Sequence, residues 1–247
     1  MAIPRRVLGL EHPNTLTGMA NVASAYRNQG RWKEAEELER EAMEMSKRML
    51  GSEHLDTLAS MANLASTLWT QGRFKEAEEL DVKVVEIRRS ILGAEYPSTL
   101  RSTANLASTY SNQGQLETAE ELFAQVMEAR KKILGLEHPD TVSSMANFAT
   151  IYHRQEREKE AEELLLQVIE TSKRILGLEH PATLMSMNNL AVLLKGNGWV
   201  TEAISLTEEC VRLRTSFLGV EHPHTLSSVT SLRSWQQGDR DSAALRV

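Results

Sequence analysis

The chain has 247 residues, of which 41% are hydrophobic and 25% charged, so it can bury a core and is neither a disordered nor a low-complexity sequence. Its 28 basic and 34 acidic side chains give a net charge of −6, which lacks the basic surface of nucleic-acid-binding proteins, so no nucleic acid partner is expected. The chain has one cysteine and begins without an apolar signal segment, which predicts a cytoplasmic protein. No apolar run reaches the ~18 residues of a membrane-spanning helix, so no membrane association is expected.

An internal repeat of 42 residues organises the sequence. Each unit opens with the phrase G-x-E-[H/Y]-x-x-T, whose fifth place is proline in every unit except the second, where it is Leu55. The phrases begin at Gly9, Gly51, Gly93, Gly135, Gly177 and Gly219. We therefore predict the end of a preceding helix over 1–8, full repeats over 9–50, 51–92, 93–134, 135–176 and 177–218, and a truncated sixth repeat over 219–247.

Two helices are predicted in each unit. The proline marks the start of the first helix, because proline at the first helical position loses no hydrogen bond. In the second unit the apolar residues from Leu58 to Leu68 follow the 3.6-residue period, and Gln71-Gly72-Arg73 ends it. A second apolar stripe, from Phe74 to Ile91, then leads to the glycine of the next phrase, which is a typical helix end.

Each unit is thus an antiparallel helical hairpin with an apolar side too large to leave exposed. Hairpins of this kind must stack on their neighbours, which predicts an all-α fold, an α-solenoid. In the sixth unit, Gln237-Gly238 predicts the turn between the two helices, two residues earlier than in the other units.

The order of residues within a hairpin resembles a known repeat. In the third unit Asn105-Leu106-Ala107 is followed by Tyr110, Gln113-Gly114 and Ala119, an order that resembles the tetratricopeptide repeat. The 42-residue period and the G-x-E-H-P-x-T phrase resemble the repeats of kinesin light chains, and those at the C-terminus of fungal NACHT/NB-ARC receptor-like proteins. The resemblance implies that the α-solenoid is wound as a right-handed superhelix. It also implies a scaffold that binds a protein or peptide, with the first helices lining the inner face.

Residues with reactive side chains are better explained by structure. The Glu-His pairs of the phrase, such as Glu137-His138, have metal-ligand chemistry, but stacked helices lie ~8–10 Å apart and zinc ligands sit ~2 Å from the ion. We therefore predict that they form a repeated turn. Cys210 takes a helix position that alanine or valine fills in other units, which predicts a core residue. The sequence indicates no catalytic residue, no metal and no cofactor, and hence not an enzyme.

An asparagine recurs at one position in the first helix of five units: Asn21, Asn63, Asn105, Asn147 and Asn189. Asparagine is a middling helix former, so the recurrence needs a reason. Either each amide bridges adjacent helices, or it projects into a concave groove and holds the main chain of an extended peptide. The resemblance adds that this position commonly contacts the ligand in tetratricopeptide repeats. The predicted peptide-binding set contains these five asparagines together with Ser66, Ser108, Arg101, Arg154 and Trp69.

The leading hypothesis is a non-catalytic scaffold that binds a peptide segment in its concave groove. The alternative is an architectural or self-associating repeat array within a larger, NACHT/NB-ARC-like signalling protein. Because both ends of the sequence fall inside units, we also expect a fragment of a longer array, whose uncapped ends allow end-to-end self-association.

Overall fold

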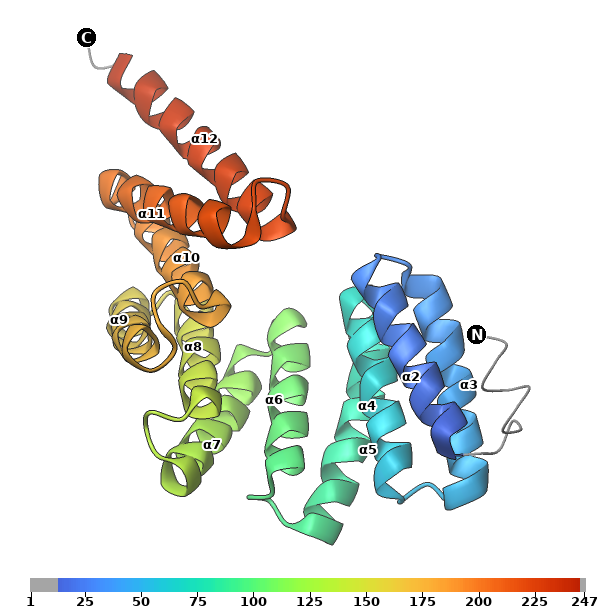
Figure 1. Ribbon diagram of the computed structural model, residues 1–247. Helices are drawn as coiled ribbons and strands as arrows, with labels where there is room; N and C mark the ends of the chain where they lie inside the picture. Colours follow the sequence, from blue (N-terminus) through green and yellow to red (C-terminus); the bar gives the residue numbers. More distant parts are fainter. Residues whose placement is uncertain (1–12, 245–247) are drawn as a thin grey trace. The chain divides into compact units, whose positions relative to one another are not determined.

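The fold, seen in a computed structural model, is described for residues 13–244 and is built from helices joined by short connections (Figure 1). The described residues contain no strand, which confirms the all-α prediction, and the predicted segment 1–8 lies outside them. No helix in this range is both long and apolar enough to cross a membrane. The helices are α2 (Pro13–Asn28), α3 (Trp32–Leu50), α4 (Leu55–Thr70), α5 (Phe74–Leu92), α6 (Pro97–Asn112), α7 (Leu116–Leu134), α8 (Pro139–Arg154), α9 (Glu158–Leu176), α10 (Pro181–Gly196), α11 (Val200–Leu218) and α12 (Pro223–Ala244).

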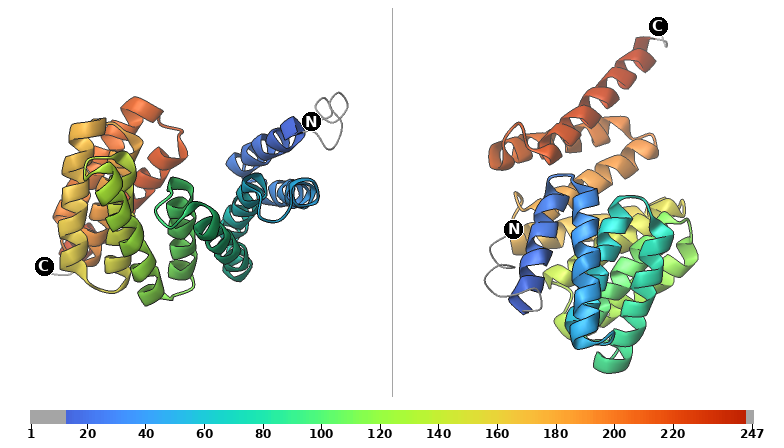
Figure 2. Two further views of the ribbon diagram at one scale, coloured as in Figure 1. Left: turned by 90° about the horizontal axis from the view of Figure 1, so that it is seen from below. Right: turned by 90° about the vertical axis from the view of Figure 1, so that its right-hand side faces the viewer.

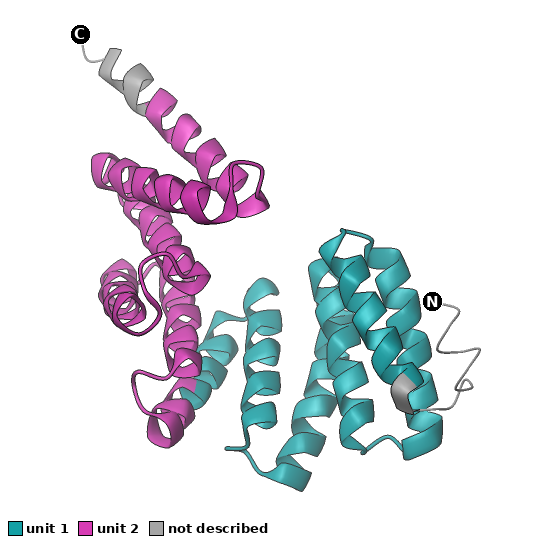
Figure 3. Cartoon of the chain, in the orientation of Figure 1, with its two compact units in different colours: residues 1–126 teal, residues 127–247 magenta. Residues whose placement is uncertain are grey.

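These helices form two compact units that are larger than the 42-residue repeats: the first unit is residues 1–126 and the second unit is residues 127–247, with the boundary inside α7 (Figure 3). In the first unit α4 packs on both α3 and α5, and α5 packs on α6. In the second unit α10 packs on both α9 and α11, and α11 packs on α12. From α2 to α5 each helix packs on the next, and the four helices form one group in Figures 1 and 2. Each unit is a stack of helical hairpins, so the predicted α-solenoid packing is confirmed.

The repeated phrase builds the connection between hairpins. Gly51 ends α3 with a φ of 92°, and its N–H donates to the carbonyl oxygen of Lys47 at 3.1 Å. His54 then caps α4, because its Nδ1 accepts from the N–H of Asp56 at 3.2 Å. Thr57 closes the turn, its Oγ1 donating to the carbonyl oxygen of Gly51 at 2.8 Å. The same cap is made by His138, His180 and His222, so the histidine of the phrase has the structural role that the sequence predicts.

An arginine near the end of the second helix ties some hairpins to the next. The Nη1 of Arg130 donates to Ser144 Oγ at 2.7 Å and to the carbonyl oxygen of Asp140 at 3.0 Å. The matching pairs in other hairpins are Arg88–Ser102 and Arg214–Ser228. Each bond joins the last turns of a second helix to the first helix that follows it along the chain.

The turn predicted at Gln237-Gly238 is wrong, because both residues lie inside α12. In earlier hairpins the turn glycine has a positive φ, as Gly114 does with 82°. The 42-residue period aligns this turn position with Arg240 and not with Gly238. Gly238 aligns instead with Asn112, the last residue of α6, which is a helical position. A glycine inside a helix costs only about 1 kcal/mol relative to alanine, so the helix continues through it.

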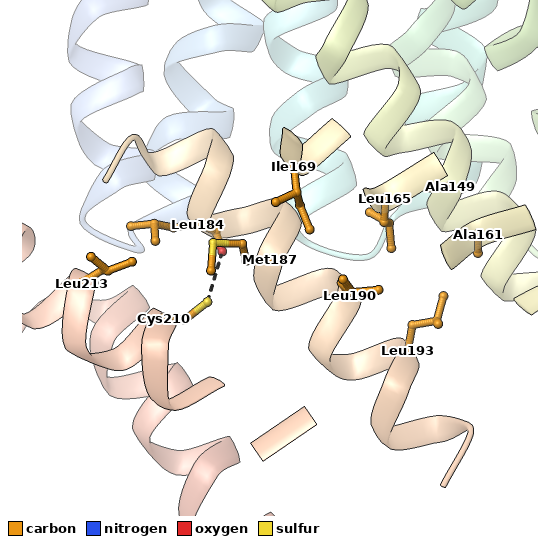
Figure 4. Close-up of a cluster of buried hydrophobic side chains, with 10 residues drawn as sticks. All are labelled: Ala149, Ala161, Leu165, Ile169, Leu184, Met187, Leu190, Leu193, Cys210 and Leu213. Carbon is orange, nitrogen blue, oxygen red and sulfur yellow. Dashed lines mark hydrogen bonds between the residues drawn. The ribbon is translucent and has the colours of Figure 1, made fainter. Parts of the chain in front are cut away.

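Cys210 belongs to the core of the second unit. Its side chain is fully buried against Leu184, Met187 and Leu213 (Figure 4), and its Sγ lies 4.0 Å from the carbonyl oxygen of Leu184. Burial raises the pKa of the thiol to about 11, so almost no reactive thiolate forms at neutral pH. The prediction of a core residue is confirmed.

We expect Cys210 to be unreactive in the folded protein. An aromatic disulfide reagent at pH 8 should label it only after denaturation, because the thiol is both enclosed and protonated. Cys210→Val should lower the free energy of unfolding by about 1 kcal/mol or less, whereas Cys210→Ser, which buries a hydroxyl, should lower it by about 1–3 kcal/mol. Rapid labelling of the native chain, followed by absorbance, would contradict this assignment.

Candidate functional site

Two adjoining pockets lie between the helices of the first unit. The Asp81 pocket has a volume of about 220 Å³ and is lined by Ala65, Ser66 and Trp69 of α4, Asp81 of α5, and Asn105, Ser108 and Thr109 of α6. The arginine pocket has a volume of about 290 Å³ and is lined by Arg27 of α2, Ala59, Ala62, Asn63 and Ser66 of α4, Arg88 of α5, and Arg101 and Asn105 of α6. Ser66 and Asn105 line both pockets, so the two meet along α4 and α6.

The structure brings part of the predicted peptide-binding set together here. The members that line the pockets are Asn63, Asn105, Ser66, Ser108, Arg101 and Trp69. Asn21 takes the matching position on α2 but lines neither pocket. Asn147 and Arg154 of α8 and Asn189 of α10 belong to the second unit. The candidate site is therefore the part of the predicted set that lies on α4 and α6.

The repeated asparagines have no hydrogen bond through their side chains to any other residue in the described part of the chain. Asn21, Asn105 and Asn147 are exposed, and Asn63 and Asn189 are half-buried. An amide that bridges adjacent helices would be bonded to the neighbouring helix. The geometry thus favours the interpretation in which the amide donors and acceptor are left for a ligand.

Trp69 forms an apolar wall of the Asp81 pocket. Its side chain is 37% exposed, and its ring meets that of Phe74 edge to face, with the ring centroids 6.2 Å apart. On α6, Ser108 Oγ donates to the carbonyl oxygen of Ala104 at 3.0 Å, which leaves the acceptor capacity of the hydroxyl unused by that bond. An aromatic face and free oxygen acceptors therefore meet in one pocket.

The Asp81 pocket ends at a buried carboxyl group that the sequence analysis did not identify. Asp81 is 3% exposed, and its Oδ2 accepts from Thr109 Oγ1 at 3.1 Å. No cationic side chain within residues 13–244 forms an ion pair with it, and burial raises the pKa of the Asp81 carboxyl to about 6. The sequence held a signal: Asp81 follows Ala77 by four residues and precedes Val84 by three, so it stands on the buried stripe of α5.

The same helix position holds a second acid in the preceding hairpin. Glu39 of α3 is also 3% exposed, but Nε of Arg27 lies 3.7 Å from its Oε1. In the two hairpins that follow, the position is filled by the buried apolar residues Phe123 and Leu165. A buried acid without a cationic partner is thus specific to Asp81 among these hairpins.

The arginine pocket has the opposite charge. Arg88 is buried, and its Nη1 is held by Ser102 Oγ and by the carbonyl oxygen of Ser98 at 3.2 Å. Burial lowers the pKa of Arg88, and the nearby charge of Arg101 lowers it further. Arg101 is exposed and pairs with no acid in the described residues. Two pockets of opposite charge therefore adjoin each other in the first unit.

Comparison with known proteins identifies close relatives of this repeat. The sequence profile of the tetratricopeptide repeat matches residues 1–48, 14–90, 56–132, 98–174 and 147–216. Two crystal structures of nearly identical TPR-like repeats from a putative kinesin light chain of Podospora anserina match at 35% identity, with TM-scores of 0.69 and 0.68, and cover 84% of this chain and 98% of theirs.

More distant structures share the fold alone. BtubC (BKLC) from P. vanneervenii is 19% identical, with a TM-score of 0.69 and 88% of each chain covered. A STAND protein with a tetratricopeptide repeat sensor from Pyrococcus horikoshii is 14% identical, with a TM-score of 0.63, over 91% of this chain and 33% of that one. None of the curated proteins matches the chain.

Asn63→Ala and Asn105→Ala should leave the folded state intact. Neither amide is bonded to another described residue, and alanine is the better helix former by a few tenths of a kcal/mol, so the melting temperature should stay within about a degree or rise. Thr109→Val is the control that should destabilise, by about 1–3 kcal/mol, because it removes the bond to the buried Asp81 carboxyl. A fall of several degrees in either asparagine variant would restore the helix-bridging interpretation.

The Asp81 carboxyl should make stability fall as pH rises. Its pKa is about 6 in the folded state and near 3.8 in the unfolded state, so between these values the folded protein holds more protons. The free energy of unfolding should decrease from pH 4 to pH 6, by at most about 3 kcal/mol, and remain lower above that range.

Asp81→Asn should therefore raise the free energy of unfolding at pH 7.5 by about 1–3 kcal/mol and change it little at pH 4, as measured by urea denaturation. The matched control is Glu79→Gln, which removes one negative charge from an exposed position of the same helix. An equal effect of Asp81→Asn at both pH values would show that the ionised carboxylate carries no such cost.

Proposed function

The chain belongs to the tetratricopeptide repeat family, and we propose that it is a non-catalytic interaction scaffold that binds an extended peptide segment along α4 and α6. The observation that carries the proposal is the pair of adjoining pockets, which share Asn105 and Ser66 and present amides that have no hydrogen bond to any other described residue. Family membership supports a general role in protein interaction, and the pockets support the proposed site on α4 and α6.

The spacing of the amides suits an extended chain. Asn63 and Asn105 stand on the first helices of successive hairpins, and both line the arginine pocket. An extended peptide advances ~3.3 Å per residue, so a ligand that crosses this pocket can meet the two amides a few residues apart. The small side chains of Ala62 and Ala65 leave room for the main chain of the ligand. Main-chain bonds would then supply affinity, and the two pockets would select side chains.

The groups that line the pockets suit binding rather than bond breaking. They are amides, hydroxyls, arginines, a tryptophan and one carboxyl, with no histidine, thiol or lysine among them. Nucleophilic or acid–base catalysis needs a nucleophile and a base within hydrogen-bond reach of each other. Thr109 and Asp81 are within such reach, but both are buried, and the other lining groups offer recognition chemistry.

Display of a random peptide library on the purified chain tests the proposal. We expect an enriched motif, and Asn105→Ala should weaken binding of a peptide with that motif by about 1–2 kcal/mol, or about 5- to 30-fold in Kd. Asn112→Ala, on the same helix but lining neither pocket, should leave Kd unchanged. The absence of any enriched peptide, or equal affinity of Asn105→Ala and the unchanged protein, would count against the proposed groove.

A second candidate function is that of a repeat array within a larger signalling protein, without a dedicated peptide ligand. It is supported by the likeness in fold to the Pyrococcus horikoshii STAND protein, in which the matching repeats make up a third of the chain. A peptide that binds only the folded state raises the melting temperature, whereas self-association makes it depend on protein concentration. Thermal unfolding over a wide range of concentrations, with and without an enriched peptide, separates the two.

A further inference from the structure

Asp81 has one carboxylate oxygen available to a ligand. Oδ2 accepts from Thr109, whereas Oδ1 has no hydrogen-bond partner among the described residues. Oδ1 also keeps some contact with solvent, unlike the fully buried polar atoms that lack a partner. Because Asp81 lines the pocket and is otherwise buried, Oδ1 is reached through the pocket. The pocket therefore ends at an oxygen that is available to a donor from outside.

The fold itself does not require an acid at this position. The apolar side chains of Phe123 and Leu165 fill the same position in later hairpins, and Glu39 in the preceding hairpin differs from Asp81 in having Nε of Arg27 3.7 Å from its Oε1. A buried charge without a partner destabilises a protein, and residues of that kind persist where function depends on them. Asp81 is such a residue, and it lies in the candidate binding site.

The other groups of the pocket suit a cation. An ammonium or guanidinium group carries only donors, and the hydroxyl and amide oxygens of Ser66, Ser108 and Asn105 can accept from it beside Asp81. The face of Trp69 adds a favourable interaction with a cation within about 6 Å of its ring. The pocket volume of about 220 Å³ is below the ~300–1,000 Å³ of sites for drug-sized ligands, which fits a single side chain.

The neighbouring charges confine the cation to this pocket. Arg88 and Arg101 of the arginine pocket repel a second positive charge, and that pocket begins where Ser66 and Asn105 are shared. A basic group therefore finds a counter-charge at the Asp81 end of the site and repulsion at the other end. This contrast allows the site to select one position of the ligand for a positive charge.

We propose that the Asp81 pocket binds the charged end of a lysine or arginine side chain of the peptide, and that this contact sets the specificity of the site. The inference rests on the proposed peptide-binding function and names the class of side chain that the site selects. The ammonium or guanidinium group donates to Oδ1 of Asp81, and the aliphatic stem of the side chain packs along Trp69.

The test begins with random-peptide display on three proteins: the unchanged chain, Asp81→Asn and Glu79→Gln. The unchanged chain and Glu79→Gln should enrich peptides with lysine or arginine at one fixed position, and Asp81→Asn should lose that preference. Asparagine keeps an oxygen that can accept from Thr109, so Asp81→Asn should remain folded, which circular dichroism checks.

A synthetic peptide with the enriched motif then serves as the probe, beside a copy in which the basic residue is replaced by norleucine. For the unchanged chain this replacement should weaken binding at least tenfold, whereas Asp81→Asn should bind both peptides with the same affinity. Such a difference assigns the contact to this pair of groups.

The possible failures are distinguishable. If the enriched peptides have no fixed basic residue and bind Asp81→Asn as tightly as the unchanged chain, but lose affinity for Asn105→Ala, the groove binds peptides and the inference about the cation is wrong. If no protein enriches any peptide, the proposed function fails and the inference fails with it.

Discussion

Every hairpin depends on the turn that joins it to the next. The glycines from Gly51 to Gly219 take a φ near +90° in these turns. The histidine caps the following helix in most of them, as His54 does, and the threonine hydroxyl bonds back to the glycine carbonyl at Thr57 and Thr183. The glycine conformation, which these turns share, sets the direction in which the chain leaves one helix and enters another. Since neighbouring hairpins bury their apolar sides against each other, this direction decides which residues meet in the core and which stay free on the first helices.

The fold could be predicted from the sequence because its signals are local and repeated. Apolar periodicity, proline at the helix start and glycine at the helix end all recur every 42 residues, and they agree with one another. The prediction failed at Gln237-Gly238, where dipeptide identity was given more weight than position in the repeat: Gly238 stands where Asn112 and Gly196 end their helices. Position within the 42-residue repeat predicts the helix at Gly238 better than the Gln-Gly dipeptide does.

The candidate site could be predicted only in part. Asn63, Asn105 and Ser66 were found because their positions recur, and recurrence is visible in a sequence. Asp81 was missed because it does not recur, and its importance depends on burial and on the absence of a cationic partner, which follow from packing. Arg88 was missed for the same reason, because its burial and its bond to Ser102 of the next hairpin follow from packing.

One position of the second helix is occupied in turn by Glu39, Asp81, Phe123, Leu165 and Thr207, while the turns around it hardly vary. The residue at this position is thus independent of the contacts that join the hairpins. A gain or loss of one 42-residue unit would keep the joints between hairpins and move the acidic position by one step along the array. If Asp81 binds a basic side chain as proposed, such a change in repeat number would also shift the place at which the array selects a positive charge, without changing any single residue.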